Sequence, residues 1–249
     1  MPLSDRKRIL LDAPDMSVRL CWYAPGEIMS AHRHELGQVS VLMSGSFRET
    51  GDARSADNQT AQIGFKPAGF EHENRYDETG ALILSVNIAE NGLRNCPGWH
   101  WQAATPAELD LARRIVLSSG ERDIIGQCAR DLVALMADRQ ALDRHPPPWA
   151  RELRDRLLSG DSVDLDAAAR TIGIHRAHLS RGFRKWYGTP PSVFALRCRM
   201  SRAVKALVAG EPAAHAAVCA GFADQSHFIR TMRRETGITP ARLSRLLAA

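Results

Sequence analysis

Apolar positions recur with two different periods along this chain, and the period changes near residue 104. Between residues 16 and 90, short runs of apolar and β-branched residues are separated by Gly, Pro, Asn and Asp. This pattern is typical of strands joined by turns. We expect four strands, over residues 18–23, 38–43, 62–65 and 81–86. Short strands at this spacing predict a small β-barrel or jelly roll.

From residue 105 onward, the apolar residues recur at the three- and four-residue intervals of helices. We expect one helix over residues 106–117, with Thr105 as its N-cap, and a second over 121–142. The second helix carries an apolar stripe, which either packs on the barrel or forms a dimer contact. The residues of this stripe are Ile124, Ile125, Cys128, Leu132, Leu135 and Met136.

The C-terminal part of the chain contains one helical pattern twice. A helix of small residues over 165–172 is followed by Gly173 and an arginine-bearing helix, and 213–220 is followed by Gly221 and another. Glycine permits the positive φ that a tight connection between helices requires. The repeat therefore predicts two helix-turn-helix units, rather than a plain helical bundle with a solvated basic face.

Each arginine-bearing helix has an apolar side and a basic side. Leu179 and Phe183 mark the apolar side of the first helix, and Phe228 and Met232 mark that of the second. Between the units, residues 191–209 form one uninterrupted helix of about 30 Å, close to one turn of B-DNA at about 34 Å. The two basic helices could therefore enter successive major grooves on one face of a duplex.

The net charge of +5 divides unevenly along the chain. From Pro146 onward there are 17 lysines and arginines against 8 aspartates and glutamates, a net charge of +9. Residues 1–145 carry 16 against 20, a net charge of −4. Because the positive charge lies with the helix-turn-helix units, a phosphate-binding surface is expected there.

The distribution of apolar residues and cysteines indicates the cellular compartment. No stretch approaches the 18 or more apolar residues of a membrane span, and no apolar segment of a signal peptide follows the charged N-terminus. We therefore expect a cytoplasmic protein. No two cysteines have CxxC spacing, so we expect reduced, mostly buried thiols rather than disulfides or a zinc site. The five are Cys21, Cys96, Cys128, Cys198 and Cys219.

Residues 148–247 resemble the AraC/XylS transcriptional regulators. The strongest stretch is AGFADQSHF at 220–228, followed by RRETGITP at 233–240, and HLSRGF at 178–183 fits the first unit. The resemblance implies a homodimeric regulator, usually an activator, that binds promoter DNA and has RNA polymerase as a further partner. It also implies DNA contacts from Asp224 and from Arg176, Ala177, Ser180, Arg181, Arg184, Gln225, Ser226, His227, Arg230 and Arg233.

These contacts divide by chemistry. Arg181 and Arg230 are the expected base readers, because a guanidinium can bond both O6 and N7 of guanine. The remaining cations of the two helices are expected to hold phosphates. They are Arg184, Lys185, Arg233 and Arg234.

The N-terminal part resembles the cupins, a barrel that often precedes this type of DNA-binding domain. Gly26, His32, His34, Gln38 and Gly45 have the spacing of the first cupin motif, with Gln38 where a glutamate is usual. Residues 67–72, PAGFEH, are similar to the second motif, although the asparagine that follows is displaced to position 74. The resemblance implies a cupin-like sensor domain.

The polar residues of these motifs leave three interpretations open. His32, His34, Gln38 and His72 could hold a divalent transition metal such as Zn, Ni, Mn or Fe. They could instead line a pocket for a small-molecule effector without metal, or lie exposed. The first two interpretations require that His32 and His34 both point inward from one strand, with Gln38 and His72 on neighbouring strands.

The sequence thus predicts an α+β protein of two domains. A cupin-like β-barrel occupies residues 1–104, linking or dimerising helices occupy 105–142, and an all-α DNA-binding domain with two helix-turn-helix units occupies 143–249. We expect a sequence-specific transcriptional regulator that responds to a small-molecule or metal effector, without catalytic residues. The alternative is a metal-dependent cupin enzyme with an accessory DNA-binding domain, which needs an open coordination position and a base.

Overall fold

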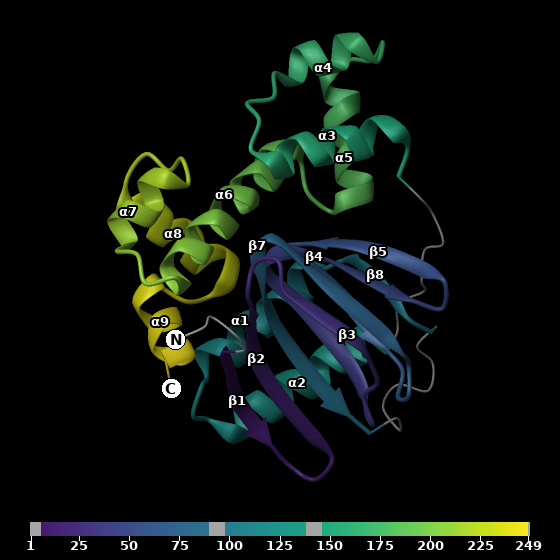
Figure 1. Ribbon diagram of the computed structural model, residues 1–249, viewed down its shortest axis with the longest axis vertical. Helices are drawn as coiled ribbons and strands as arrows, with labels where there is room; N and C mark the ends of the chain where they lie inside the picture. The colour runs from purple at the N-terminus through teal and green to yellow at the C-terminus, as the bar shows by residue number, and fades with distance from the viewer. Residues whose placement is uncertain (1–5, 90–97, 138–145, 249) are drawn as a thin grey trace.

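The computed structural model describes residues 6–89, 98–137 and 146–248. Its N-terminal part is one curved antiparallel sheet, and the described helices all follow that sheet in the chain (Figure 1). The strands are β1 (Arg6–Asp12), β2 (Met16–Tyr23), β3 (Ile28–His32), β4 (Gly37–Gly51), β5 (Arg54–Gln59), β6 (Gln62–Lys66), β7 (His72–Ile88) and β8 (His100–Ala103).

The two long strands β4 and β7 organise the barrel. They pair with each other, while β4 pairs first with β6 and then with β5, and β7 pairs first with β3 and then with β2. Both strands bend where Gly45, at φ +96°, meets Gly80, at φ +64°. A Cβ on Gly45 would lie 1.9 Å from the Gly80 carbonyl oxygen, so only glycine permits this approach.

The fold class predicted from the sequence is confirmed, but the sheet contains more strands than were predicted. The four predicted strands lie within β2, β4, β6 and β7, which extend beyond the expected bounds. β1, β3, β5 and β8 were not predicted. β5, with the sequence RSADNQ, illustrates why: it contains no apolar run, and pairing with β4 makes it a strand.

Two helices cover one side of the barrel. α1 (Pro106–Leu117) begins where it was predicted, with the Thr105 side chain accepting a hydrogen bond from the Glu108 amide at 3.2 Å. α2 (Arg122–Ala137) lies against β1 and β2, and the predicted continuation to residue 142 falls outside the described residues. Four stripe residues pack inward, while Ile124 and Leu135 remain 39% and 38% exposed. Barrel packing therefore accounts for most of the stripe.

The C-terminal helices form two groups joined by α6, which runs diagonally between them in Figure 1. The first group is α3 (Pro148–Ser159), α4 (Leu165–Thr171) and α5 (Arg176–Tyr187). The second follows α6 (Pro191–Val208) and comprises α7 (Ala213–Cys219), α8 (Gln225–Thr236) and α9 (Pro240–Ala248). None of the described helices has the length and apolar content to cross a membrane.

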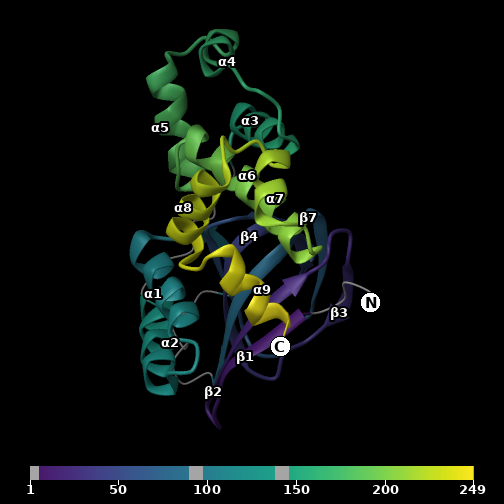
Figure 2. The same cartoon turned by 90° about the vertical axis from the view of Figure 1, so that its left-hand side faces the viewer.

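The two groups belong to different apolar cores. α3, α4, α5 and the first half of α6 enclose their own core around Phe183 and Phe194. The second group shares a continuous core with the barrel, through residues such as Met200 and Leu243. The second helix-turn-helix unit is therefore packed on the barrel, as the side view in Figure 2 shows for α8 and α9. The four described cysteines are free, and of these only Cys219 is exposed.

Candidate functional site

The two helix-turn-helix units are built by the same local chemistry. Gly173, at φ +71°, and Gly221, at φ +81°, turn the chain after α4 and α7. The second helix of each unit then starts on a side-chain cap. The ring of His175 accepts from the Ala177 amide at 3.2 Å, and Asp224 accepts from the His227 amide at 2.6 Å.

In α5, the buried stripe fixes which side chains face outward. Leu179 and Phe183 are 1% and 0% exposed, and they hold the helix on the core of the first group. The predicted DNA-contacting side chains lie on the other side, exposed except for the half-buried Ser180. They are Arg176, Ala177, Ser180, Arg181 and Arg184. Arg176 forms an ion pair with Asp166 at 2.9 Å.

In α8, Phe228 and Met232 are both fully buried. Gln225, Ser226, Arg230 and Arg233 are exposed on the opposite side, while His227 is half-buried with its ring edge-on to Phe222. Asp224, which the resemblance also placed at the DNA, is exposed, and its carboxylate caps α8 by accepting from the His227 amide. Capping gives this residue a structural role at the edge of the exposed face.

Four guanidinium groups on these faces stand free. The side chains of Arg181, Arg184, Arg230 and Arg233 make no hydrogen bond or ion pair with any residue that the structure describes. Arg234, by contrast, pairs with Glu235 at 3.0 Å. Unpaired arginines on two exposed helix faces provide donors for phosphate oxygens and guanine edges.

A second cluster lies inside the barrel, where the structure brings three predicted histidines together. Potential ligand atoms of His32, His34 and His72 lie within 4.8 Å of one another. His32 and His72 are register partners at the ends of β3 and β7. His34 lies just beyond β3, not on it as predicted, but it still reaches the cluster.

Hydrogen bonds orient two of these rings. Nδ1 of His32 lies 2.9 Å from the Ser30 carbonyl oxygen, and Nδ1 of His72 lies 3.2 Å from that of Phe70. A carbonyl only accepts, so each Nδ1 carries a proton and Nε2 is the ring nitrogen that remains for a ligand. Nε2 of His72 is buried and has no hydrogen-bond partner. Such an orphaned nitrogen fits a metal ligand oriented by its second ring nitrogen.

The surroundings favour the neutral form of two of the rings, His34 and His72. Burial, followed by the charge of Lys66, lowers the pKa of His34 to about 4 and that of His72 to about 3. Neutral imidazole is the form that binds metals. The donor set therefore fits a divalent transition metal.

Gln38 lies beside the histidines with its amide already bonded. Its nitrogen donates to Asn87 at 2.9 Å, and its oxygen accepts from Ser40 at 3.1 Å. The cavity that these residues share has a volume of about 30 Å³. This volume accommodates one ion or one water molecule and excludes an organic effector.

The sequence did not indicate a buried ion pair beside this cavity. Lys66 Nζ lies 3.2 Å from Glu49 Oε2, which also accepts from Trp101 Nε1 at 3.2 Å. One signal was present: Glu49 lies two residues after the buried Phe47 on a strand, and alternation places both side chains on one face.

Comparison with known proteins gives a family match for the C-terminal part. Residues 168–245 match the family model described as a helix-turn-helix domain. No curated protein matches the chain.

Among solved structures, wild-type ToxT from Vibrio cholerae with bound unsaturated fatty acid is 10% identical, over 95% of this chain and 97% of that one, with a TM-score of 0.40. A cupin superfamily protein from Desulfitobacterium hafniense is 16% identical, over 34% and 78%, with a TM-score of 0.33. KdgF from Halomonas is 15% identical, over 34% and 79%, with a TM-score of 0.31.

The family match and the repeated units define the C-terminal part of the chain as a DNA-binding domain. Residues 168–245 form a helix-turn-helix domain of the AraC type, as the sequence resemblance predicted.

Proposed function

We propose that the protein is a sequence-specific transcriptional regulator that applies both helix-turn-helix units to one DNA duplex. The observation that carries this proposal is the repeat of free, outward-facing arginines on α5 and α8. α6 separates the units with 18 residues, or about 27 Å at 1.5 Å per residue. Units attached at its two ends fit major grooves about 34 Å apart.

Binding selection tests this function. Purified protein is incubated with random-sequence duplexes at fixed salt, and bound DNA is amplified over several rounds. The proposal expects enrichment of one promoter-like sequence. Retention that depends only on salt, with no enriched sequence, would mean that the basic surface binds phosphates without reading bases.

We propose that His32, His34 and His72 hold one divalent transition metal as an effector or a structural ion, with Gln38 as a candidate fourth ligand. The ion would supply a positive charge that links the ends of β3 and β7. The orphaned Nε2 of His72 supports this assignment. A metal-dependent enzyme would need room for substrate beside the metal, and the volume of about 30 Å³ favours a regulator.

We also propose that the regulator is an activator that works with RNA polymerase as a homodimer. Exposed Leu117, Ile124 and Leu135 on α1 and α2 offer an apolar contact, since they are 44%, 39% and 38% exposed. A reporter gene behind the selected site should rise in expression, and sedimentation should give twice the chain mass. A fall in expression would make the protein a repressor.

A further inference from the structure

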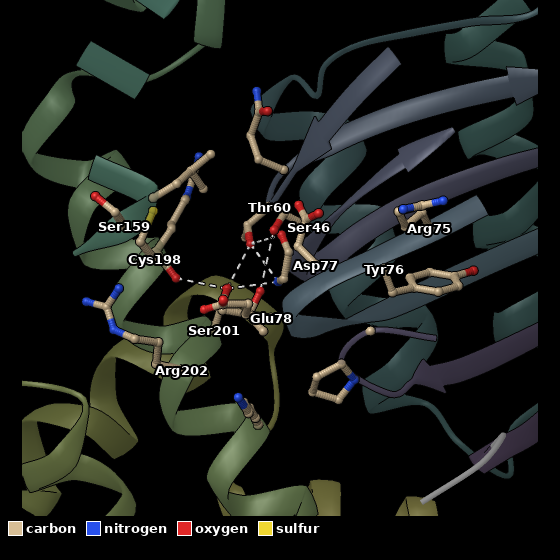
Figure 3. A pocket seen from close by; sticks show the side chains of 18 of the residues that line it. Ser46, Thr60, Arg75, Tyr76, Asp77, Glu78, Ser159, Cys198, Ser201 and Arg202 are labelled. Atoms are coloured by element: carbon tan, nitrogen blue, oxygen red, sulfur yellow. Dashed lines mark hydrogen bonds between the residues drawn. The ribbon is translucent and has the colours of Figure 1, made fainter. Parts of the chain in front are cut away.

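A cavity of about 890 Å³ lies between the barrel and the helices (Figure 3). One wall comes from the bend of β7 and the neighbouring strand ends, and the other comes from α6 and the end of α3. Cavities of 300–1,000 Å³ are typical of small-molecule sites. Because the histidine cavity is too small for an organic effector, this larger cavity is the better place for one.

The cavity has a fixed base. Ser201 on α6 lies within hydrogen-bond distance of Ser44, Gly45 and Thr60, and it is 4% exposed. The close contact between Gly45 and Gly80 sets the barrel side of this base. The cavity is therefore largely pre-formed, with one wall from each part of the molecule.

The helical wall carries unpaired positive charge. Arg202 and Lys205 lie one turn apart on α6, and their side chains make no hydrogen bond or ion pair within the described residues. Arg202 is half-buried, and its guanidinium lies over Gly160, where an added Cβ would come within 3.1 Å of it. The end of α3 thus holds this cation at the cavity edge, where an acidic group could bind it.

The barrel wall carries a net negative charge. The side chains of Asp77 and Glu78 are exposed at the bend of β7 and form no hydrogen bond or ion pair with another described residue, although Asp77 is close enough to Arg48 to raise its pKa. Arg75 is the one cation that β7 adds to this lining, so two carboxylates stand against one guanidinium. Apolar side chains also line the cavity, among them the buried Phe194 on α6 and the exposed Ile28 on β3. Ile28 is 59% exposed, so an apolar ligand body would cover it.

We propose that this cavity binds a zwitterionic small molecule with an apolar body. Its acidic group would contact Arg202 and Lys205, and its cationic group would contact Asp77 and Glu78. Because the α6 wall is positive and the barrel wall is net negative despite Arg75, a ligand with charges of both signs can pair with both walls, whereas a singly charged ligand pairs with only one. Because α6 joins both helix-turn-helix units, the ligand fixes their orientation relative to the barrel.

This control of orientation rests on the proposed DNA-binding function, whereas ligand binding is measured without DNA, so the two can fail separately. Titration calorimetry on the full chain uses 6-aminohexanoic, 8-aminooctanoic and 12-aminododecanoic acids as probes. The matched fatty acids and alkylamines carry one charge each. We expect at least one amino acid to bind roughly tenfold more tightly than both of its matched analogues.

Variants locate the site. Arg202→Gln and the double change Asp77→Asn with Glu78→Gln should each weaken binding by roughly tenfold, which is about 1.4 kcal/mol. Arg151→Gln and Asp110→Asn remove exposed charges away from the cavity and should leave affinity unchanged. Melting temperatures confirm that each variant folds. The proposal is overturned if no amino acid binds at concentrations on the order of 10 mM, if singly charged analogues bind equally, or if the cavity variants bind like the parent.

Discussion

Ser201 Oγ on α6 accepts a hydrogen bond of 2.8 Å from the backbone amide of Gly45, at the bend of β4. The same hydroxyl lies 3.1 Å from the Arg197 carbonyl oxygen one turn earlier on the helix. The helix that connects the two helix-turn-helix units is thus bonded directly to the barrel.

Removing this hydroxyl should loosen the junction. In Ser201→Ala, the Gly45 amide keeps Thr60 Oγ1 as a second acceptor at 3.0 Å, but the buried Ser44 hydroxyl loses its acceptor at 3.2 Å, so the loss should be about 1 to 3 kcal/mol. Urea unfolding measures the difference. Ser192→Ala, an exposed change on the same helix, is the control. Equal stability of the two variants would show that the junction contributes nothing.

Two arginines on α8 should differ in their effect on DNA binding. Arg230→Ala should cost about 1 to 3 kcal/mol on the selected site and relax one base position. Arg233→Ala should weaken binding to any duplex and reduce the salt slope by about one, as expected for a phosphate contact. Fluorescence anisotropy on selected and scrambled duplexes separates the two effects. Identical losses on both duplexes for both variants would refute the assignment.

The histidine cluster should bind metal stoichiometrically. After reconstitution with Zn, Ni, Mn or Fe, elemental analysis should find one ion per chain, and His72→Ala should lose it, because three imidazoles hold the site. His178→Ala, an exposed histidine outside the barrel, should retain the ion. A parent protein without stoichiometric metal after reconstitution would leave the cluster as a polar lining.

The pair between Arg197 and Glu235, at 2.8 Å, should make stability depend on acidity. Burial raises the pKa of Glu235, but the neighbouring Arg197 and Arg234 outweigh it, so the net pKa is below the ordinary 4.5. Because the pKa of Glu235 is lower in the folded chain than in the unfolded chain, its ionised carboxylate stabilises the fold at pH values above the unfolded-state pKa. This stabilisation is lost as the pH falls through the folded-state pKa. Glu235→Gln should therefore be less stable at pH 7 by about 1 to 3 kcal/mol.

The difference between Glu235→Gln and the parent should shrink as the pH is lowered through the acidic range below 4.5. Unfolding by urea at several pH values measures it. Glu152→Gln on the exposed side of α3 serves as the control for a lost surface charge. A difference that stays constant with pH would mean that packing, not ionisation, accounts for the effect.

Helix starts and turns depend on residues close together in the sequence, and these features were predicted from it. The Thr105 cap marked the start of α1, and Gly173 and Gly221 marked both helix-turn-helix turns. The three histidines were found from motif spacing, and the structure brings them together.

Contacts between residues far apart in the sequence could not be predicted from the hydrophobic pattern. The bond between Gly45 and Ser201 joins residues 156 positions apart, and neither hydrophobic period nor capping chemistry encodes such a contact. The same holds for the interdomain cavity, whose two walls come from separate parts of the chain. β5 also lacks an apolar run, and it can be identified as a strand only from its pairing with β4.

Footprinting of the selected site shows whether both helix-turn-helix units bind one duplex. Methylation interference on that site reports which guanines the protein contacts in the major groove. We expect two blocks of contacts about one helical turn apart on one face of the DNA, with Arg181→Ala erasing one block and Arg230→Ala the other. A single block, lost in only one of these variants, would contradict this prediction.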